Sequence, residues 1–179
     1  MSGAVFLDFR KAFDLVHRDI LLKKLSSYNL SMASITFLRS YLQGRLQCVF
    51  VNGTYSPTTS ITSVVPQGSI VGPLLFCIFS NDLPMCLKRA LVQCDLFAGG
   101  GTLNTASDNI DNIRRDLQQS LNISGWPCRN QMALNPSKRK CTLMAMRHKQ
   151  QLPLNLNFET TPVEQVSKHR LLGELYTSS

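Results

Sequence analysis

Asp8 is the first residue of the chain whose position suggests chemistry, because it lies near the end of an apolar run from Ala4 to Phe9. A carboxylate that closes a buried strand costs free energy unless water solvates it, a cation pairs with it or a metal ion binds it. Strand-end aspartates also commonly cap the turn that follows, so a purely structural role is the alternative. The residues elsewhere in the chain decide between these roles.

Three later segments carry residue types that could complete a site around Asp8. Pro66-Gln67-Gly68-Ser69 is a polar turn ahead of an apolar helix, and its glycine permits close backbone approach. Ala98-Gly99-Gly100-Gly101 lies between two strand-like runs and predicts the turn of a hairpin. A basic cluster occupies 138–140, for which a solvated surface is the alternative.

The elements that must position these segments follow from the spacing of apolar residues. Strands are predicted over 4–9, 45–51, 60–65, 91–97, 102–105 and 140–146. Helices are predicted over 17–28, from Ser31 to near Gly44 and through 74–79. A long amphipathic helix is predicted from near Asp108, with its apolar face at Ile110, Ile113, Leu117 and Leu121, with Trp126 as a further candidate for that face, and with Pro127 ending or kinking it. The last thirty or so residues are weakly patterned. This order predicts an α+β fold, an antiparallel sheet backed by helices on one face.

Composition narrows the class of protein. The chain has 179 residues and a formal net charge of +8, which suits one domain and favours a polyanionic partner. The longest apolar run, 70–79, is about half the ~20 residues that span a bilayer, so no membrane segment is expected. The six cysteines form no C-x-x-C pair, which predicts reduced, mostly buried thiols and an intracellular protein.

Taken in chain order, these motifs resemble a reverse transcriptase, specifically the LINE-type RNA-directed DNA polymerase of non-LTR retrotransposons. The resemblance is carried by 7–14 (Leu-Asp-Phe-Arg-Lys-Ala-Phe-Asp), by 65–76 and by the hairpin at Leu96-Phe97-Ala98. It continues through Asn81-Asp82-Leu83-Pro84, Trp126 and 134–138, and so covers about Val5 to Met146. It implies a polymerase palm, an antiparallel sheet backed by helices, with parts of the fingers inserted around 21–63.

The resemblance implies the chemistry of nucleotide addition. A polymerase joins a primer 3′-hydroxyl to an incoming nucleotide with two Mg²⁺ ions about 3.5–4 Å apart. Mg²⁺ prefers oxygen ligands, and in the family one aspartate comes from the first strand, which matches Asp8 as catalytic and metal-binding residue. The backbone carbonyl of Phe9 resembles a further ligand. The two other aspartates belong to a Phe-Ala-Asp-Asp or Tyr-Ala-Asp-Asp hairpin.

Four more residues match nucleotide- or template-binding positions. Phe13 resembles the bulky gate beneath the sugar, with a core aromatic as the alternative. Gln67 and Gly68 resemble the loop along the template base, with an ordinary turn as the alternative. Lys138 resembles the basic residue that approaches the triphosphate. The resemblance places Asp82 on the helix side, away from this pocket.

The sequence departs from the family at the hairpin, where Gly99 and Gly100 replace both aspartates. Glycine has no side-chain oxygen, so Asp8 is the carboxylate that survives. Asp95 lies four strand residues before Gly99, about 13 Å away, and cannot substitute. Losing two carboxylates costs several kcal/mol each in transition-state stabilisation, so we expect a catalytically inactive chain in which Mg²⁺ binding is weak or lost.

The resemblance also implies a domain organisation. One partial reverse transcriptase domain is expected over 1–179, divided into a palm core with inserted fingers elements over 1–105, the remainder of the palm over 106–150 and a truncated approach to the thumb over 151–179. Weak binding of an RNA template and DNA primer is expected. The alternatives are a non-catalytic nucleic-acid-binding remnant and a non-functional retrotransposon fragment. The cluster at 138–140 is the basis for expecting a nuclear location.

Overall fold

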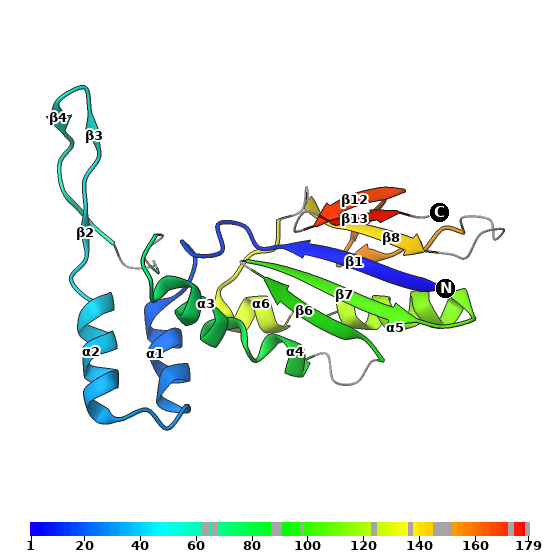
Figure 1. Cartoon of the computed structure of the whole chain (residues 1–179), viewed down its shortest axis with the longest axis horizontal. Helices are drawn as coiled ribbons and strands as arrows, with labels where there is room; N and C mark the ends of the chain where they lie inside the picture. The colour runs from blue at the N-terminus through cyan, green and yellow to red at the C-terminus, as the bar shows by residue number, and fades with distance from the viewer. Residues whose placement is uncertain are drawn as a thin grey trace. The chain divides into compact units, whose positions relative to one another are not determined.

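Two compact units make up the chain. The computed structural model describes residues 1–61, 65, 68–86, 91–97, 99–122, 125–135, 138–144, 152–171 and 174–177 (Figure 1). The first unit combines Met1–Arg10 with Asp82–Ser179, and the second is Lys11–Asn81. The chain therefore leaves the first unit after its first strand and returns to it seventy-one residues later.

The first unit is built on a five-stranded mixed sheet with the order β11-β8-β1-β7-β6. Its strands are β1 (Ser2–Asp8), β6 (Gln93–Phe97), β7 (Gly100–Ala106), β8 (Lys140–Met144) and β11 (Glu164–Gln165). Central β1 is antiparallel to β7 and β8, and β6 is antiparallel to β7, whereas β11 runs parallel to β8. The predicted α+β class is confirmed, but the prediction of a purely antiparallel sheet is wrong. The long connection after β8 allows β11 to run in the same direction as β8.

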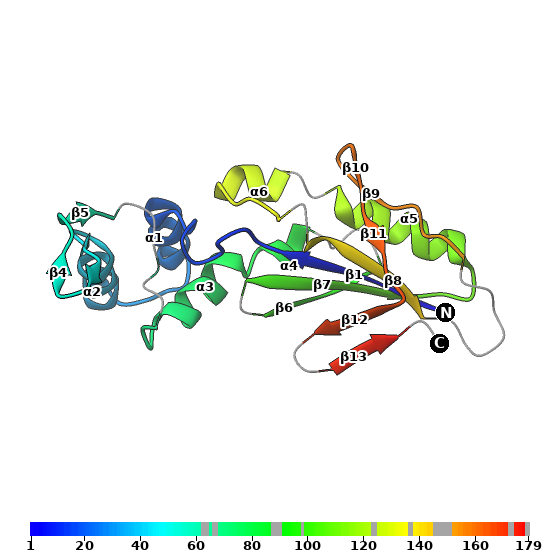
Figure 2. The same ribbon diagram turned by 90° about the horizontal axis from the view of Figure 1, so that it is seen from above.

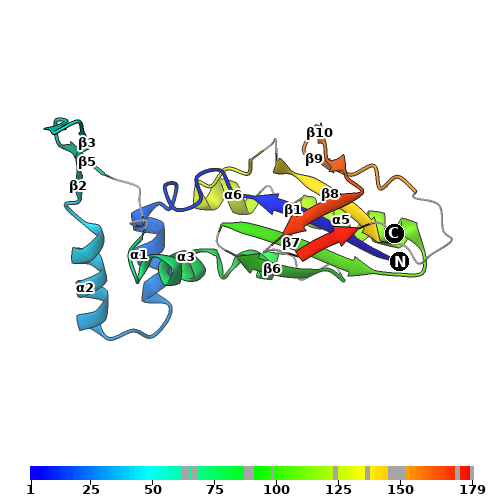
Figure 3. The same cartoon turned by 45° about the horizontal axis from the view of Figure 1, so that its top comes forward.

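The two faces of this sheet carry different partners. Helix α5 (Ile110–Leu121) packs on β1 and β7, so closely that a Cβ at Gly3 would overlap Ile113. On the opposite face lies the hairpin of β12 (Lys168–Leu171) and β13 (Glu174–Thr177), as Figure 2 and Figure 3 show. Because side chains alternate along β1, Gly3 faces the helix and Phe6 faces this hairpin.

Helix α5 begins close to the predicted start, but it ends at Leu121, before the predicted end at Pro127. The side chain of Asn109 accepts a hydrogen bond from the Asp111 backbone N–H and caps it. Trp126 is not on α5 but on a separate short helix, α6 (Gly125–Asn130). The prediction that Pro127 ends or kinks the long helix is wrong, because Pro127 lies in the first turn of α6, where no backbone N–H is needed.

The second unit packs three helices around a small core. They are α1 (Arg18–Ser26), α2 (Met32–Leu42) and α3 (Gly72–Ser80), and α1 contacts the other two. Leu21, Leu25 and Phe79 are fully buried between them. The Ser31 hydroxyl accepts a hydrogen bond from the Ser34 backbone N–H, which confirms the predicted cap of α2.

Between α2 and α3 the chain forms two short strand pairs. β2 (Leu46–Gln47) pairs with β5 (Thr59–Ser60), and β3 (Phe50–Val51) pairs with β4 (Thr54–Tyr55). Asn52 and Gly53 have φ values of 49° and 81°, which confirms the predicted tight turn. The returning strand was predicted over 60–65; the returning chain instead forms β4 and β5, which end at Ser60, and 62–64 are outside the described residues.

The C-terminal region is more ordered than its weak pattern predicted. It forms β9 (Asn157–Phe158), β10 (Thr161–Pro162), β11, β12 and β13. Leu154, Leu156 and Phe158 are buried. These residues alternate with polar ones along the sequence, which is the period of a half-buried strand and could have predicted an extended segment here.

The cysteines differ from the prediction in burial. All six lie in described residues without a disulfide, but only Cys141 is buried, and Cys48, Cys77, Cys86 and Cys128 are exposed. The expectation of mostly buried thiols is therefore wrong, because Cys77, Cys86 and Cys128 lie at outward positions of helices and Cys48 lies between β2 and β3. Burial raises the pKa of the Cys94 and Cys141 thiols to about 11, with the Asp95 charge adding to the effect at Cys94, so both stay protonated at neutral pH.

Candidate active site

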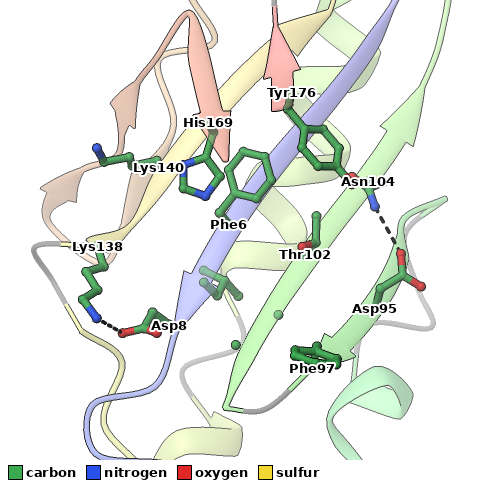
Figure 4. A pocket seen from close by; sticks show the side chains of 13 residues that line it. Phe6, Asp8, Asp95, Phe97, Thr102, Asn104, Lys138, Lys140, His169 and Tyr176 are labelled. Atoms are coloured by element: carbon green, nitrogen blue, oxygen red, sulfur yellow. Dashed lines mark hydrogen bonds and ion pairs between the residues drawn. The ribbon is translucent and has the colours of Figure 1, made fainter. Parts of the chain in front are cut away.

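Strand register brings Asp8 and the glycine hairpin together. Asp8 pairs with Gly100 of β7, and Gly100 pairs with Phe97 of β6. Side chains two residues apart along a strand point to the same face of the sheet. Phe6 of β1 and Asp95 of β6 therefore lie on the same face as Asp8 and Phe97. They line a cavity of about 630 Å³ whose other side chains include Thr102, Asn104, Lys138, Lys140, His169 and Tyr176 (Figure 4).

Asp8 is paired with a lysine in this cavity. The Nζ of Lys138 lies 3.3 Å from its Oδ2, and the amide of Asn135 donates to the same oxygen at 3.4 Å. The Asp8 side chain is 37% exposed and that of Lys138 is 65% exposed, so the pair is solvent-screened and contributes roughly 0–1 kcal/mol. The Lys138 ammonium group therefore occupies a position beside the Asp8 carboxylate that a bound metal cation would also take.

The hairpin backbone is shaped by its glycines. Gly99 has a φ of 92°, a conformation that residues with a side chain rarely adopt. Its carbonyl accepts a hydrogen bond from the Phe9 backbone N–H at 2.9 Å, which ties the turn to the end of β1. A Cβ on Gly100 would lie 3.2 Å from the Leu7 carbonyl oxygen, a tight contact. Ala98 is outside the described residues.

The side chains of this face do not fit a two-metal site. Two Mg²⁺ ions need several oxygen ligands held close together. Asp8 and Asp95 are two strands and two residues apart, which puts them about 12 Å from each other. The Asp95 carboxylate accepts hydrogen bonds from Gln93 and Asn104, each at 3.2 Å. Within the described part of the chain, no three His, Cys, Asp or Glu residues come close enough to hold a metal ion.

The other residues singled out from the sequence lie in different places. Phe9 is 4% exposed, and its ring centroid is 5.6 Å from that of Trp126, so the ring belongs to the core of the first unit. Phe13 belongs to the second unit, where its ring lies 4.9 Å from that of Phe76. Gly68 is also in the second unit, with a φ of 80°, and Gln67 is outside the described residues.

Asp82 lies where the resemblance implied. Its carboxylate accepts a hydrogen bond from the indole N–H of Trp126 at 2.9 Å. It is not among the residues that line the cavity around Asp8. The contact joins the segment before α4 (Leu83–Cys86) to α6.

Sequence reasoning missed the wall of the cavity made by the C-terminal hairpin. The ring centroid of His169 lies 3.9 Å from that of Phe6, and Tyr176 meets Phe6 edge-on at 5.4 Å. Alternation along the first strand could have placed Phe6 beside Asp8. Nothing in the sequence near His169 and Tyr176 marks them as neighbours of β1. Each strand of the hairpin has four residues, which is too short to show which of its faces is buried.

Burial and the nearby Lys140 ammonium lower the pKa of His169 below its ordinary 6.5. The unfolded chain therefore binds more protons than the folded chain as pH falls through 6.5, and the stability present above that pH is lost below it. We predict that the thermal unfolding midpoint decreases as the pH is lowered from about 7 to about 5, and that it decreases less in His169→Phe. Equal falls in the two proteins would contradict this role of His169.

The fold and the site define an α+β domain in which a strand-end carboxylate faces the turn of a β-hairpin. Residues 2–173 match the family of reverse transcriptases (RNA-dependent DNA polymerases), and the chain belongs to this family. This confirms the resemblance found in the sequence. Members of the family generally use Mg²⁺ and bind nucleic acid. Among the helices in the described residues, none is long and apolar enough to cross a membrane.

The matching relatives are RNA-directed DNA polymerases of non-LTR retrotransposons. The chain is 29% identical over 184 residues to the probable RNA-directed DNA polymerase from transposon X-element of Drosophila melanogaster, covering 97% of this chain and 19% of that protein. It is also 29% identical over 179 residues to the corresponding protein from transposon BS, covering 96% and 19%. It is 40% identical over 83 residues to the RNA-directed DNA polymerase from mobile element jockey of Drosophila funebris, covering 46% and 9%. The chain thus spans about 19% of the length of the first two relatives.

Proposed function

We propose that this chain is the palm, with inserted fingers elements, of a reverse transcriptase domain that binds an RNA template and DNA primer without adding nucleotides. The observation that supports it best is the register that sets Asp8 opposite Gly100. Both hairpin positions that carry aspartates in the family are glycines here. Each missing carboxylate removes on the order of 10²–10³ in rate, if it acts as other preorganised charge-stabilising groups do.

The remaining site residues enter the proposal in the roles that the family implies. Asp8 is the surviving catalytic carboxylate, and the Phe9 carbonyl is a weak ligand beside it. Phe13 lies beneath the sugar, and Gln67 and Gly68 contact the template base. Lys138 approaches the phosphates in the family role, which requires it to leave Asp8.

The domain organisation is part of the same proposal. The second unit, Lys11–Asn81, is inserted between β1 and β6 and suits the fingers elements expected around 21–63. The sheet of the first unit suits the palm. We further propose that the protein acts inside the cell, with the cluster at 138–140 directing it to the nucleus.

Binding without catalysis is supported by the net charge of the chain and not by the cavity alone. Lys138 and Lys140 line the cavity together with Asp8 and Asp95, so these four charges cancel. The net charge of +8 on the whole chain still favours a polyanion. The expected binding is weak and falls steeply with salt.

Fluorescence anisotropy with a labelled RNA–DNA template–primer tests this proposal. We expect Lys140→Gln and Lys138→Gln each to weaken binding and to reduce the slope of log affinity against log salt by about 1. Lys23→Gln removes the same charge from an exposed position of α1 and is the matched control. Equal affinities in all three variants would contradict binding at this cavity. Absence of binding at low salt would favour a chain without function.

A further inference from the structure

A protruding segment of the second unit has no role in the function proposed above. We call residues Arg45–Ser60, which contain β2, β3, β4 and β5, the hairpin arm. Every residue from Gln43 to Ser60 is exposed to solvent. The arm nevertheless carries large apolar side chains whose exposed fractions are 53–69%, namely Leu46, Val49, Phe50, Val51 and Tyr55. Such side chains on a surface commonly mark a binding site.

Two of these side chains form an ordered aromatic pair. Phe50 of β3 is directly opposite Tyr55 of β4, and their ring centroids are 4.5 Å apart with the planes inclined by 40°. The turn at Asn52-Gly53 fixes the register of the pair. Their rings are held against each other while 58% and 69% of the two residues stays open to solvent. Ordered, exposed rings are suited to stacking on a flat ligand.

The charge of this region selects a polyanionic ligand. From Ser31 to Ser60 no aspartate or glutamate occurs, whereas Arg39 and Arg45 do. At the base of the arm the Arg45 guanidinium lies 5.2 Å from the ring centroid of Tyr41. Exposed rings together with uncompensated positive charge are the features by which proteins bind single-stranded nucleic acid.

The arm also contains a hollow of suitable size. A cavity of about 460 Å³ lies between the two strand pairs, and its polar lining includes Gln47, Ser56, Thr59 and Ser60. This volume is within the range of small-ligand sites. Hydroxyl and amide groups can contact a sugar or a phosphate without reading base sequence.

We propose that the hairpin arm binds single-stranded nucleic acid, with unpaired bases stacked on Phe50 and Tyr55 and phosphates near Arg45. A protein strand is a poorer occupant, because each strand of the arm is only two residues long and offers little edge to pair with. Thr54, Ser56 and Thr58 also divide its apolar residues. This site differs from the template–primer site in its unit and in its ligand, a single strand.

Anisotropy of a labelled oligothymidylate with the full chain tests the proposal. We expect Phe50→Ala with Tyr55→Ala to weaken binding at least ~10-fold, since each stacked base contributes about 1–3 kcal/mol. Replacing both by leucine keeps the apolar bulk and removes the rings, so it should weaken binding as much. Tyr55→Phe should bind as the native chain does. Full affinity in the alanine or the leucine variant would overturn the proposal.

Two further measurements separate this site from its rivals. Lys138→Gln with Lys140→Gln should leave the affinity for oligothymidylate unchanged. The aromatic variants should leave the affinity for a blunt-ended RNA–DNA duplex unchanged. Loss of both affinities in one variant would mean one shared site and would overturn the proposal. Circular dichroism melting should be the same in all aromatic variants, because the replaced side chains are exposed. The native chain could instead self-associate through the arm. In that case the alanine variant alone would lose self-association and would keep its oligonucleotide affinity, and the arm would be a contact with a second copy of the chain.

Discussion

Replacing Gly99 and Gly100 together by aspartate should create a divalent-cation site that depends on Asp8. Gly100 is opposite Asp8 in the β1–β7 register, so a carboxylate there would join the same row of the sheet. Mn²⁺ binding, followed by electron paramagnetic resonance, should become at least ~10-fold tighter, which corresponds to about 1.4 kcal/mol. Asp8→Asn in the same background should abolish the gain.

A matched control separates charge from shape in this experiment. Gly99→Asn with Gly100→Asn has the same size and the same backbone strain but no added charge. Both pairs should lose about 1–3 kcal/mol of stability, because Gly99 has a φ of 92°. Cation binding by the asparagine pair as tight as by the aspartate pair would contradict a carboxylate site. Adding Lys138→Met to the aspartate pair should tighten binding further, because it removes the ammonium 3.3 Å from Asp8.

Trp126→Ala should cost about 3–5 kcal/mol of unfolding free energy. Trp126 is 1% exposed, its indole N–H donates to Asp82, and its ring packs against Phe9 at the end of β1. The substitution removes a large buried ring and leaves a cavity beneath the strand that carries Asp8. Urea denaturation followed by circular dichroism measures the loss.

Two other substitutions calibrate that result. Trp126→Phe keeps a ring and loses the hydrogen bond to Asp82, so it should cost about 1–3 kcal/mol. Met85→Ala on α4 removes a side chain that is 58% exposed, so it should change stability by less than about 0.5 kcal/mol. A loss from Trp126→Ala no larger than that from Met85→Ala would contradict the central place of the indole in this core.

Local sequence pattern predicted the elements with a clear period. The apolar run of β1, the two strands of the β6–β7 hairpin and the amphipathic α5 were found from spacing alone, because β1, β7 and α5 bury apolar faces and β6 alternates exposed with partly buried residues. Alternation along β1 could also have put Phe6 on the face of Asp8, but this prediction was not made. The β2–β5 and β3–β4 pairs were harder to place, since strands of two residues have no period to detect.

The contacts that complete the candidate site depend on residues far apart in the chain. Lys138 meets Asp8 only because β8 pairs with β1, and His169 meets Phe6 only because a later hairpin lies on the same face. Pairing between distant strands is set by the whole fold, and no local pattern in the sequence specifies it. The separate helix α6 was missed because a proline was taken to end the preceding helix, although proline is tolerated in the first turn of a new one.

Primer extension decides whether the face that carries Asp8 has lost nucleotide addition. The reaction contains the native chain, an RNA template with an annealed DNA primer, the four deoxynucleotides and Mg²⁺. A reverse transcriptase with an intact aspartate hairpin is the positive control, and Asp8→Asn detects a contaminating polymerase. We predict no extension by the native chain under conditions in which the control extends every primer. Extension by the native chain that disappears in Asp8→Asn would contradict this and would show that the two hairpin aspartates are dispensable.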